Sequence, residues 1–309
     1  MMPSGVGGAL EGGRRTGVVL HEKSRLMSPR NGVASRPTSI PVLYPMHLIS
    51  VSDFLELDRL HPHQELKRQG KLVERTLAHD GQILFISHQW LGWVDPDPTA
   101  EQLKVIQRVL LRLKAGDLGD VEADWISQLV LGDKSKLNAA ELAAAIPQAF
   151  VWMDYISMPQ ANFSGPMGRE LDELSDAAAA RMCVESSADA IKSIPAYVEY
   201  STIILVVAPP CLHSNSREAD GTPALCNFQS WRSRGWCRVE YGAALLARQQ
   251  VPILVVQGEN YTPELMFPVD TLLLPAGEGH YTCCSRNHDF GYGPVLCASR
   301  CATLCMAHA

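Results

Sequence analysis

The stretch ILFISHQW, residues 83–90, decides the fold class of this 309-residue chain. Its first five residues, Ile83–Ser87, form a short run that is almost entirely apolar. Three similar runs follow along the chain, at Phe150–Asp154, Ile203–Ala208 and Val251–Val256. Near-continuous hydrophobicity over so few residues predicts strands that are buried on both faces, as in a parallel sheet.

Helical patterns separate these runs. Residues Glu101–Lys114 place apolar side chains on one face, Arg169–Ile194 contains an alanine-rich run, and Trp236–Arg248 repeats small and apolar residues at helical spacing. Strands that alternate with helices predict an α/β domain with a doubly wound parallel sheet, which we place at residues 81–274. The segment 116–147 is longer than a crossover requires, and we interpret it as a helical insertion.

The flanking segments differ from this domain in composition. Residues 1–40 hold six Lys/Arg against two Glu among Gly, Ser and Pro, which predicts a disordered basic head. Residues 41–80 have apolar side chains at helical spacing with a break at Pro62, which predicts a helical N-terminal extension of two short helices. Residues 275–309 are expected to be an irregular tail. Its Cys297, Cys301 and Cys305 lack the Cys-x-x-Cys spacing of zinc sites, so packing or surface thiols are favoured over metal.

The bulk composition excludes several classes of partner. A net charge of −6 gives no basic imbalance that would indicate nucleic acid binding. The longest strongly apolar run, 203–208, is far shorter than the roughly 20 residues that cross a bilayer, and the first residues lack an apolar signal core. The nine cysteines are odd in number and scattered, which is typical of reduced thiols. We therefore expect a cytoplasmic protein, in cytosol or nucleus.

Polar residues follow the first two predicted strands. Ser87 and His88 end the first strand, and Asp154 ends the second. Ligands of doubly wound sheets bind beyond the carboxyl ends of the strands, so these three residues are candidates for binding a ligand. The alternative is local: Ser87 and His88 cap the following loop, and Asp154 caps the next turn.

Glu240 is the candidate catalytic residue. In the stretch 230–241 (SWRSRGWCRVEY), Trp236 and Glu240 are four apart, so a helix stacks them on one face. Ala243 and Ala247 continue that face, which is therefore expected to pack inward, where an acid needs a partner. The alternative is that Glu240 only complements the helix dipole, since the capping-box position three residues before it holds Cys237.

An inward-facing acid beside a tryptophan suits the cleavage of nicotinamide from ribose in NAD. The leaving group is a neutral base and needs no general acid, so one carboxylate can suffice where ordinary glycosidases use two. Glu240 would stabilise the oxocarbenium-like charge while Trp236 stacks on the pyridinium. Arg232, Arg234 and Arg238 either meet the pyrophosphate or belong to a solvated loop. NAD is the substrate here, so no further cofactor and no metal are expected.

The order of these segments resembles that of the Toll/interleukin-1 receptor (TIR) domain. Its members share a Phe-Ile-Ser strand, a strand ending in Asp, a Ser-Ile helix leading to a third strand, and a Trp-Cys-x-x-Glu helix before a Pro-bearing strand. The corresponding segments here are 83–87, 151–154, 190–209, 235–240 and 251–256. The resemblance implies a flavodoxin-like fold, signalling through homotypic self-association and, in many members, NAD hydrolysis by the Glu of that motif. Glu240 would then be catalytic, with Trp236, Ser87, His88 and Asp154 around the nucleotide.

Three hypotheses remain open at this point. The first is a TIR-like NAD nucleosidase with a signalling or stress-response role. The second is a catalytically silent TIR-like module that acts by self-association. The third is a structural domain in which Glu240 pairs with a neighbouring arginine.

Overall fold

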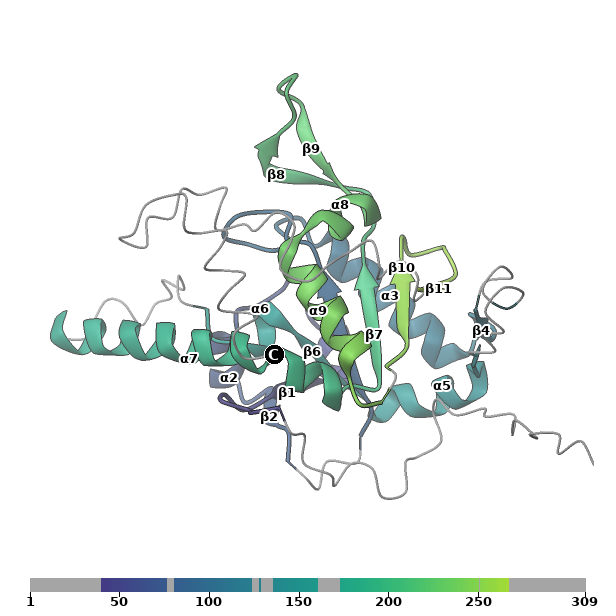
Figure 1. Cartoon of the computed structure of the whole chain (residues 1–309), viewed down its shortest axis with the longest axis horizontal. Helices are drawn as coiled ribbons and strands as arrows, with labels where there is room; N and C mark the ends of the chain where they lie inside the picture. The colour runs from purple at the N-terminus through teal and green to yellow at the C-terminus, as the bar shows by residue number, and fades with distance from the viewer. Residues whose placement is uncertain are drawn as a thin grey trace, which may run out of the picture.

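The computed structural model describes residues 40–76, 81–123, 128, 136–160, 173–249 and 251–266. Over these residues the chain is an α/β protein with a central seven-stranded sheet and helices on both faces (Figure 1). The strand order is β11-β10-β7-β3-β6-β1-β2. The bounds are β1 His47–Ser50, β2 Leu72–Glu74, β3 Ile83–His88, β6 Phe150–Met153, β7 Ile203–Val207, β10 Ile253–Val256 and β11 Glu264–Leu265.

The four apolar runs form the middle of the sheet, as predicted. They are β3, β6, β7 and β10, and every pairing among them is parallel. Numbered by their own order along the chain, they lie as 2-1-3-4, which is consistent with a doubly wound class of sheet. All six residues of β3 are buried, because helices cover both of its faces.

The sheet is mixed, which corrects the expectation of a purely parallel one. The strands β1, β2 and β11 pair antiparallel at the two ends of the sheet. In the expected helical extension, α1 (Val51–Leu55) and α2 (His63–Arg68) are present on either side of Pro62. Leu72 and Val73, however, lie in β2, opposite Ile49 and Leu48. The apolar pattern of residues 72–74 is too short to distinguish a helix from a strand. The segment forms a strand because pairing with β1 satisfies backbone N–H and C=O groups of both segments.

Two hydrophobic layers hold the helices on the sheet. On β3, Leu84 and Ile86 belong to one cluster together with α1, α3 (Glu101–Ala115), α5 (Ala139–Ala145) and the 3-10 helix η1 (Ile146–Gln148). Ile83 and Phe85 belong to the other, with α7 (Glu173–Tyr200), α8 (Phe228–Ser233) and α9 (Gly235–Leu246). This alternation is the period of two of a strand whose two faces are both packed.

The insertion at 116–147 is only partly helical. It contains α5, but also β4 (Val121–Glu122) and β5 (Lys136–Leu137), which pair antiparallel. Lys136 bonds to Asp120 and Glu122 across this small hairpin, at 2.8 and 3.0 Å. Asn138 then caps α5 by accepting from the N–H groups of Ala140 and Glu141.

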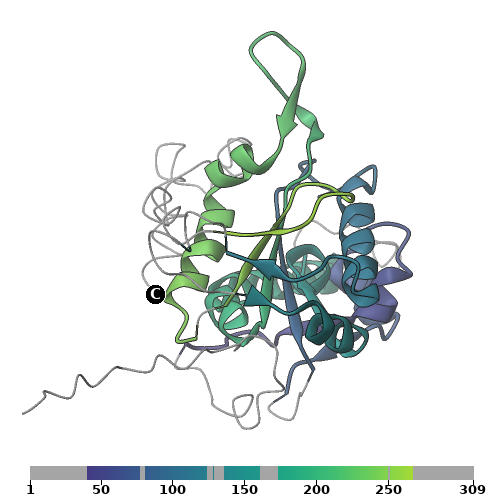
Figure 2. The ribbon, with the colours of Figure 1, turned by 90° about the vertical axis from the view of Figure 1, so that its right-hand side faces the viewer.

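A projecting hairpin follows β7 and was not predicted. Its strands are β8 (Cys211–Arg217) and β9 (Pro223–Cys226), and it stands clear of the body of the molecule in two views (Figures 1 and 2). We call it the arm. It leads into α8, which begins with a capping box between Asn227 and Ser230.

Several predictions lie outside the described residues. They include residues 1–39 of the predicted basic head (1–40) and the whole predicted tail (275–309) with its five cysteines. Cys183, Cys211, Cys226 and Cys237 are described and are free thiols. Among the described helices, none has the length and apolar character needed to cross a membrane.

Candidate functional site

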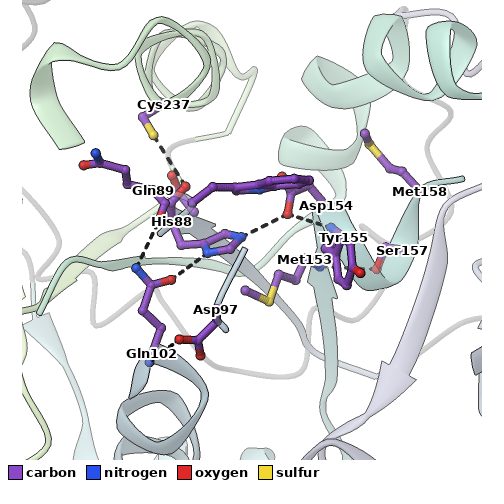
Figure 3. A network of polar contacts seen from close by, with 12 residues as sticks. His88, Gln89, Asp97, Gln102, Met153, Asp154, Tyr155, Ser157, Met158 and Cys237 are labelled. Carbon is purple, nitrogen blue, oxygen red and sulfur yellow. Dashed lines mark hydrogen bonds and ion pairs between the residues drawn. The ribbon is translucent and has the colours of Figure 1, made fainter. Parts of the chain in front are cut away.

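The candidate site lies at the carboxyl ends of β3 and β6, beneath the first turns of α9 (Figure 3). Ser87 and His88 are the last residues of β3, and Asp154 opens α6 (Asp154–Ser157) directly after β6. The structure joins these predicted residues in two contacts: Ser87 with Glu240, and His88 with Asp154. His88 and Asp154 are 66 positions apart and meet because their parallel strands end at the same edge, whereas Glu240, 153 positions from Ser87, reaches this edge from α9.

Glu240 is held by a chain of two hydrogen bonds. The Ser87 hydroxyl donates to Oε2 of Glu240 at 2.5 Å, and Nε1 of Trp231 donates to the Ser87 hydroxyl at 3.1 Å. Glu240 is 8% exposed and lies in the second turn of α9, so its role is not that of a first-turn dipole partner. Of the described groups, the one that bonds to its carboxyl is this hydroxyl and not an arginine.

Burial raises the pKa of Glu240 to about 8. The Ser87 hydrogen bond and the charge of His88 act in the opposite direction, whereas the negative charge of Asp154 adds to the rise. The physical reason is that a carboxylate loses its hydration in this position and receives only one strong donor in exchange. Glu240 is therefore a neutral carboxylic acid at pH 7.

His88 is an imidazolium, because both of its ring nitrogens must donate. Nε2 lies 3.0 Å from Oδ1 of Asp154, and Nδ1 lies 2.8 Å from Oε1 of Gln102 (Figure 3). The Gln102 amide donates from Nε2 to the carbonyl of Gln89, which leaves only its oxygen to face the histidine. Burial by itself lowers the pKa of His88, but the charge and hydrogen bond of Asp154 outweigh it and the pKa is raised.

Asp154 is the ionised acid of the site. It accepts from Nε2 of His88, from Nε1 of Trp90 at 2.8 Å and from the N–H of Tyr155 at 2.6 Å. Burial raises its pKa, but the His88 charge and these donors outweigh burial and lower it. Its side chain is 26% exposed. Since a carboxylate offers about four acceptor positions, one remains for a ligand. Asp154 is the first residue of α6 and bonds to the N–H of the next residue, but no side chain caps this helix, so the local alternative of a cap is not what the structure shows.

Asp97 fixes the position of Gln102, which in turn contacts His88. Its carboxylate accepts from the N–H groups of Gln102 and Leu103 at the start of α3, at 3.2 and 2.8 Å. This cap positions Gln102 against His88 (Figure 3). The turn at residues 95–98 leads into α3, and neither Asp97 nor Gln102 was predicted from the sequence to contribute to the site. The sequence feature that could have identified them is an acidic residue just before a helix, followed by an amide side chain in the first turn.

The indole that contacts Ser87 belongs to Trp231 of α8, which was not among the predicted site residues. Trp236 lies one turn before Glu240 on α9 and is half-buried. Trp90 is also half-buried, and its ring meets that of Tyr155 edge-on at 5.6 Å. Of the arginines proposed for a pyrophosphate, Arg238 donates from Nε to the backbone carbonyl of Arg232.

The described residues contain no group of three or more His, Cys, Asp or Glu side chains arranged to hold a metal ion. No protein-family model, curated protein or solved structure matches the chain. The chemistry of the site must therefore be inferred from its own side chains. It offers a neutral carboxylic acid and an ionised, partly exposed carboxylate at one edge of the sheet, each with its protonation state set by the fold.

Proposed function

We propose that this chain hydrolyses the bond between nicotinamide and ribose in NAD, with Glu240 as the catalytic residue. The observation that carries the proposal is that two carboxyl groups lie in contrasting surroundings at the carboxyl edge of the sheet: Glu240 is buried and receives one hydroxyl donor, whereas Asp154 is partly exposed and receives three donors. Environments that push two carboxyl pKa values apart are typical of catalytic sites. The carboxyl end of β3 is also where the strand order reverses, which is where doubly wound sheets bind ligands.

A positively charged substrate would activate Glu240. The nicotinamide ring of NAD is a cation, and a cation brought next to a buried carboxyl group favours its ionised form. Binding would thus release the proton of Glu240 and produce an unsolvated carboxylate beside the ribose. That carboxylate then stabilises the positive charge that develops on the sugar as the bond to nicotinamide breaks and neutral nicotinamide departs with the bonding electron pair; water adds to the ribose carbon and gives up a proton, which restores the neutral acid at Glu240.

Asp154 would orient the ribose. Three protein donors hold its carboxylate, and its remaining acceptor position is suited to a ribose hydroxyl. Ser87 positions Glu240, and His88 positions Asp154. Trp236 keeps its proposed place against the pyridinium ring, and Trp90, which borders Asp154, is a second aromatic surface for it.

The proposal extends to the family. The strand order β6-β3-β7-β10 and the position of the Trp-Cys-Arg-Val-Glu segment at the start of α9 support a divergent TIR-like domain. On this proposal the strand ending at Asp154 and the helix bearing Glu240 keep the family's relative order.

The test is nicotinamide release from NAD by the purified full chain, followed by chromatography. Glu240→Gln keeps the shape and neutrality of the resting side chain but cannot ionise, so we expect release to fall by about 100-fold or more. Glu56→Gln removes an exposed carboxylate and is the matched control, with wild-type rate. Absence of release at high protein concentration, or equal rates in wild type and Glu240→Gln, would refute the enzymatic proposal.

Self-association without catalysis is the second candidate, and one feature favours it. On the arm, Leu212 and Leu225 are directly opposite each other and are 59% and 49% exposed, while their neighbours Cys211 and Cys226 are buried against Leu91. An exposed leucine pair on a projecting hairpin is suited to contact with another protein surface. Light scattering over a concentration series tests this, with Leu212→Ser as the variant. A particle mass that stays monomeric over the whole range would exclude it.

A further inference from the structure

A second site is suggested by a hollow on another part of the molecule, between α2 and α7. These two helices lie side by side (Figure 1), and Gln64 of α2 donates to the sulfur of Cys183 on α7 at 3.4 Å. The hollow has a volume of about 360 Å³, within the range of small-molecule sites. Its lining shares no residue with the candidate site around Glu240.

The lining is positively charged. Lys67 and Arg68 are exposed and face this hollow, and none of the lining residues that the structure describes is acidic, although the chain as a whole carries a net charge of −6. The nearby acid Glu74 lies 3.6 Å from Nε2 of His47, outside the lining. Within its described lining, the hollow thus presents two positive charges and no negative one.

Lys67 is held in place by a neutral histidine. Nδ1 of His47 lies 3.1 Å from the carbonyl of Pro45 and must donate to it, so Nε2 of His47 accepts from the Lys67 ammonium at 3.2 Å. Burial and the charge of Lys67 lower the pKa of His47, which keeps the ring neutral. An ammonium has three N–H groups, and this bond uses one of them. Two donors of a positioned cation remain for a ligand.

The floor of the hollow adds no charge. His63 is buried there, and its Nε2 lies 3.2 Å from the hydroxyl of Tyr44. Burial, together with His47 and Lys67, lowers the pKa of His63 to about 3, so this ring is neutral at physiological pH. The hydroxyl of Ser186 on α7 contributes a further polar group. The lining therefore combines an uncharged, partly aromatic floor with two cations and a hydroxyl.

We propose that this hollow binds a small molecule carrying a phosphate group, with the phosphate between Lys67 and Arg68. A phosphate carries close to two negative charges at neutral pH and offers several acceptor oxygens, which matches two adjacent cations. Arg68 supplies a planar fork for two phosphate oxygens, and Lys67 supplies a point charge. This site is independent of the proposed hydrolysis of NAD.

The experiment is calorimetric titration of the full chain with inorganic pyrophosphate at low ionic strength. Lys67→Gln and Arg68→Gln should each weaken binding by about tenfold, which is the effect of losing one charge-assisted contact. Lys104→Gln is the matched control, since Lys104 is an exposed lysine on α3 outside this hollow, and it should bind as wild type. Ser186→Phe adds bulk to the lining without changing charge and should also remove binding.

Circular dichroism identifies any variant that fails to fold, and the two glutamine variants keep the test valid if Ser186→Phe does. No binding by the wild-type chain would overturn the proposal. Equal weakening by Lys104→Gln would also overturn it, because the attraction would then be a general effect of charge. Nicotinamide release by Lys67→Gln should match wild type, so failure of this proposal and failure of the enzymatic one remain distinguishable.

Discussion

The protonation state of Glu240 can be measured through the stability of the protein. A carboxyl group whose pKa is raised from 4.5 in the unfolded chain to about 8 in the folded one stabilises the fold below pH 4.5. That contribution is lost as the pH rises through about 8. At about pH 6 the group is two units below its folded pKa, and at about 1.4 kcal/mol per unit it still contributes about 3 kcal/mol. At about pH 9 it contributes almost nothing.

The substitution Glu240→Gln removes this dependence, because glutamine stays neutral at every pH. Urea unfolding at about pH 6 and about pH 9 should show that the free energy of unfolding falls by about 3 kcal/mol more in the wild type than in Glu240→Gln. Glu56→Gln should retain the wild-type decline. If wild type and Glu240→Gln lose stability in parallel, Glu240 is not a buried acid with a raised pKa, and the electrostatic argument for its role fails.

Three further outcomes are expected. Asp154→Asn should leave the His88 imidazolium buried without its counter-ion and lower the free energy of unfolding in urea by about 3 kcal/mol. This loss should be largest between pH 3.8 and 6.5, because the stabilisation from ionised Asp154 disappears below that window and the stabilisation from protonated His88 disappears above it. A pH-independent loss would contradict the ion pair. In the native state, iodoacetamide should modify Cys226 at least about tenfold more slowly than Cys183, because Cys226 is buried and its thiol pKa is raised to about 11. Mass spectrometry measures the two rates, and equal rates would contradict the burial of Cys226. Asn227→Ala should lose the capping box of α8 and cost about 1 kcal/mol, seen as a melting temperature lower by about 2–4 °C; an unchanged melting temperature would show that this cap is not stabilising.

The sequence predicted the middle of the sheet well because burial on both faces leaves a direct signal. A strand such as β3 must be apolar at every position before its carboxyl end, and Ser87 and His88 then stand out as polar residues. Glu240 could also be found, because an acid on a helix face that continues into alanines is an anomaly. In each case the information lies within a few consecutive residues.

The partners of these residues could not be predicted in the same way. Gln102 and Asp97 act on His88 from the start of α3, and Trp231 reaches Ser87 from α8, 144 positions away. Nothing in the local sequence separates Trp231 from Trp236, because both are tryptophans in one short stretch. The choice between them depends on where α8 packs. The same holds for β2, whose residues became a strand because β1 offered an open backbone edge.

The sequence by itself therefore determined which segments are buried, in what order they follow, and which polar residues stand at the ends of the strands. Hydrophobic burial is additive along the chain, so local patterns carry it. Only the tertiary structure decided the protonation states of Glu240, His88 and Asp154. A pKa depends on the solvent and charges within a few ångströms, and here those charges come from residues far apart along the chain.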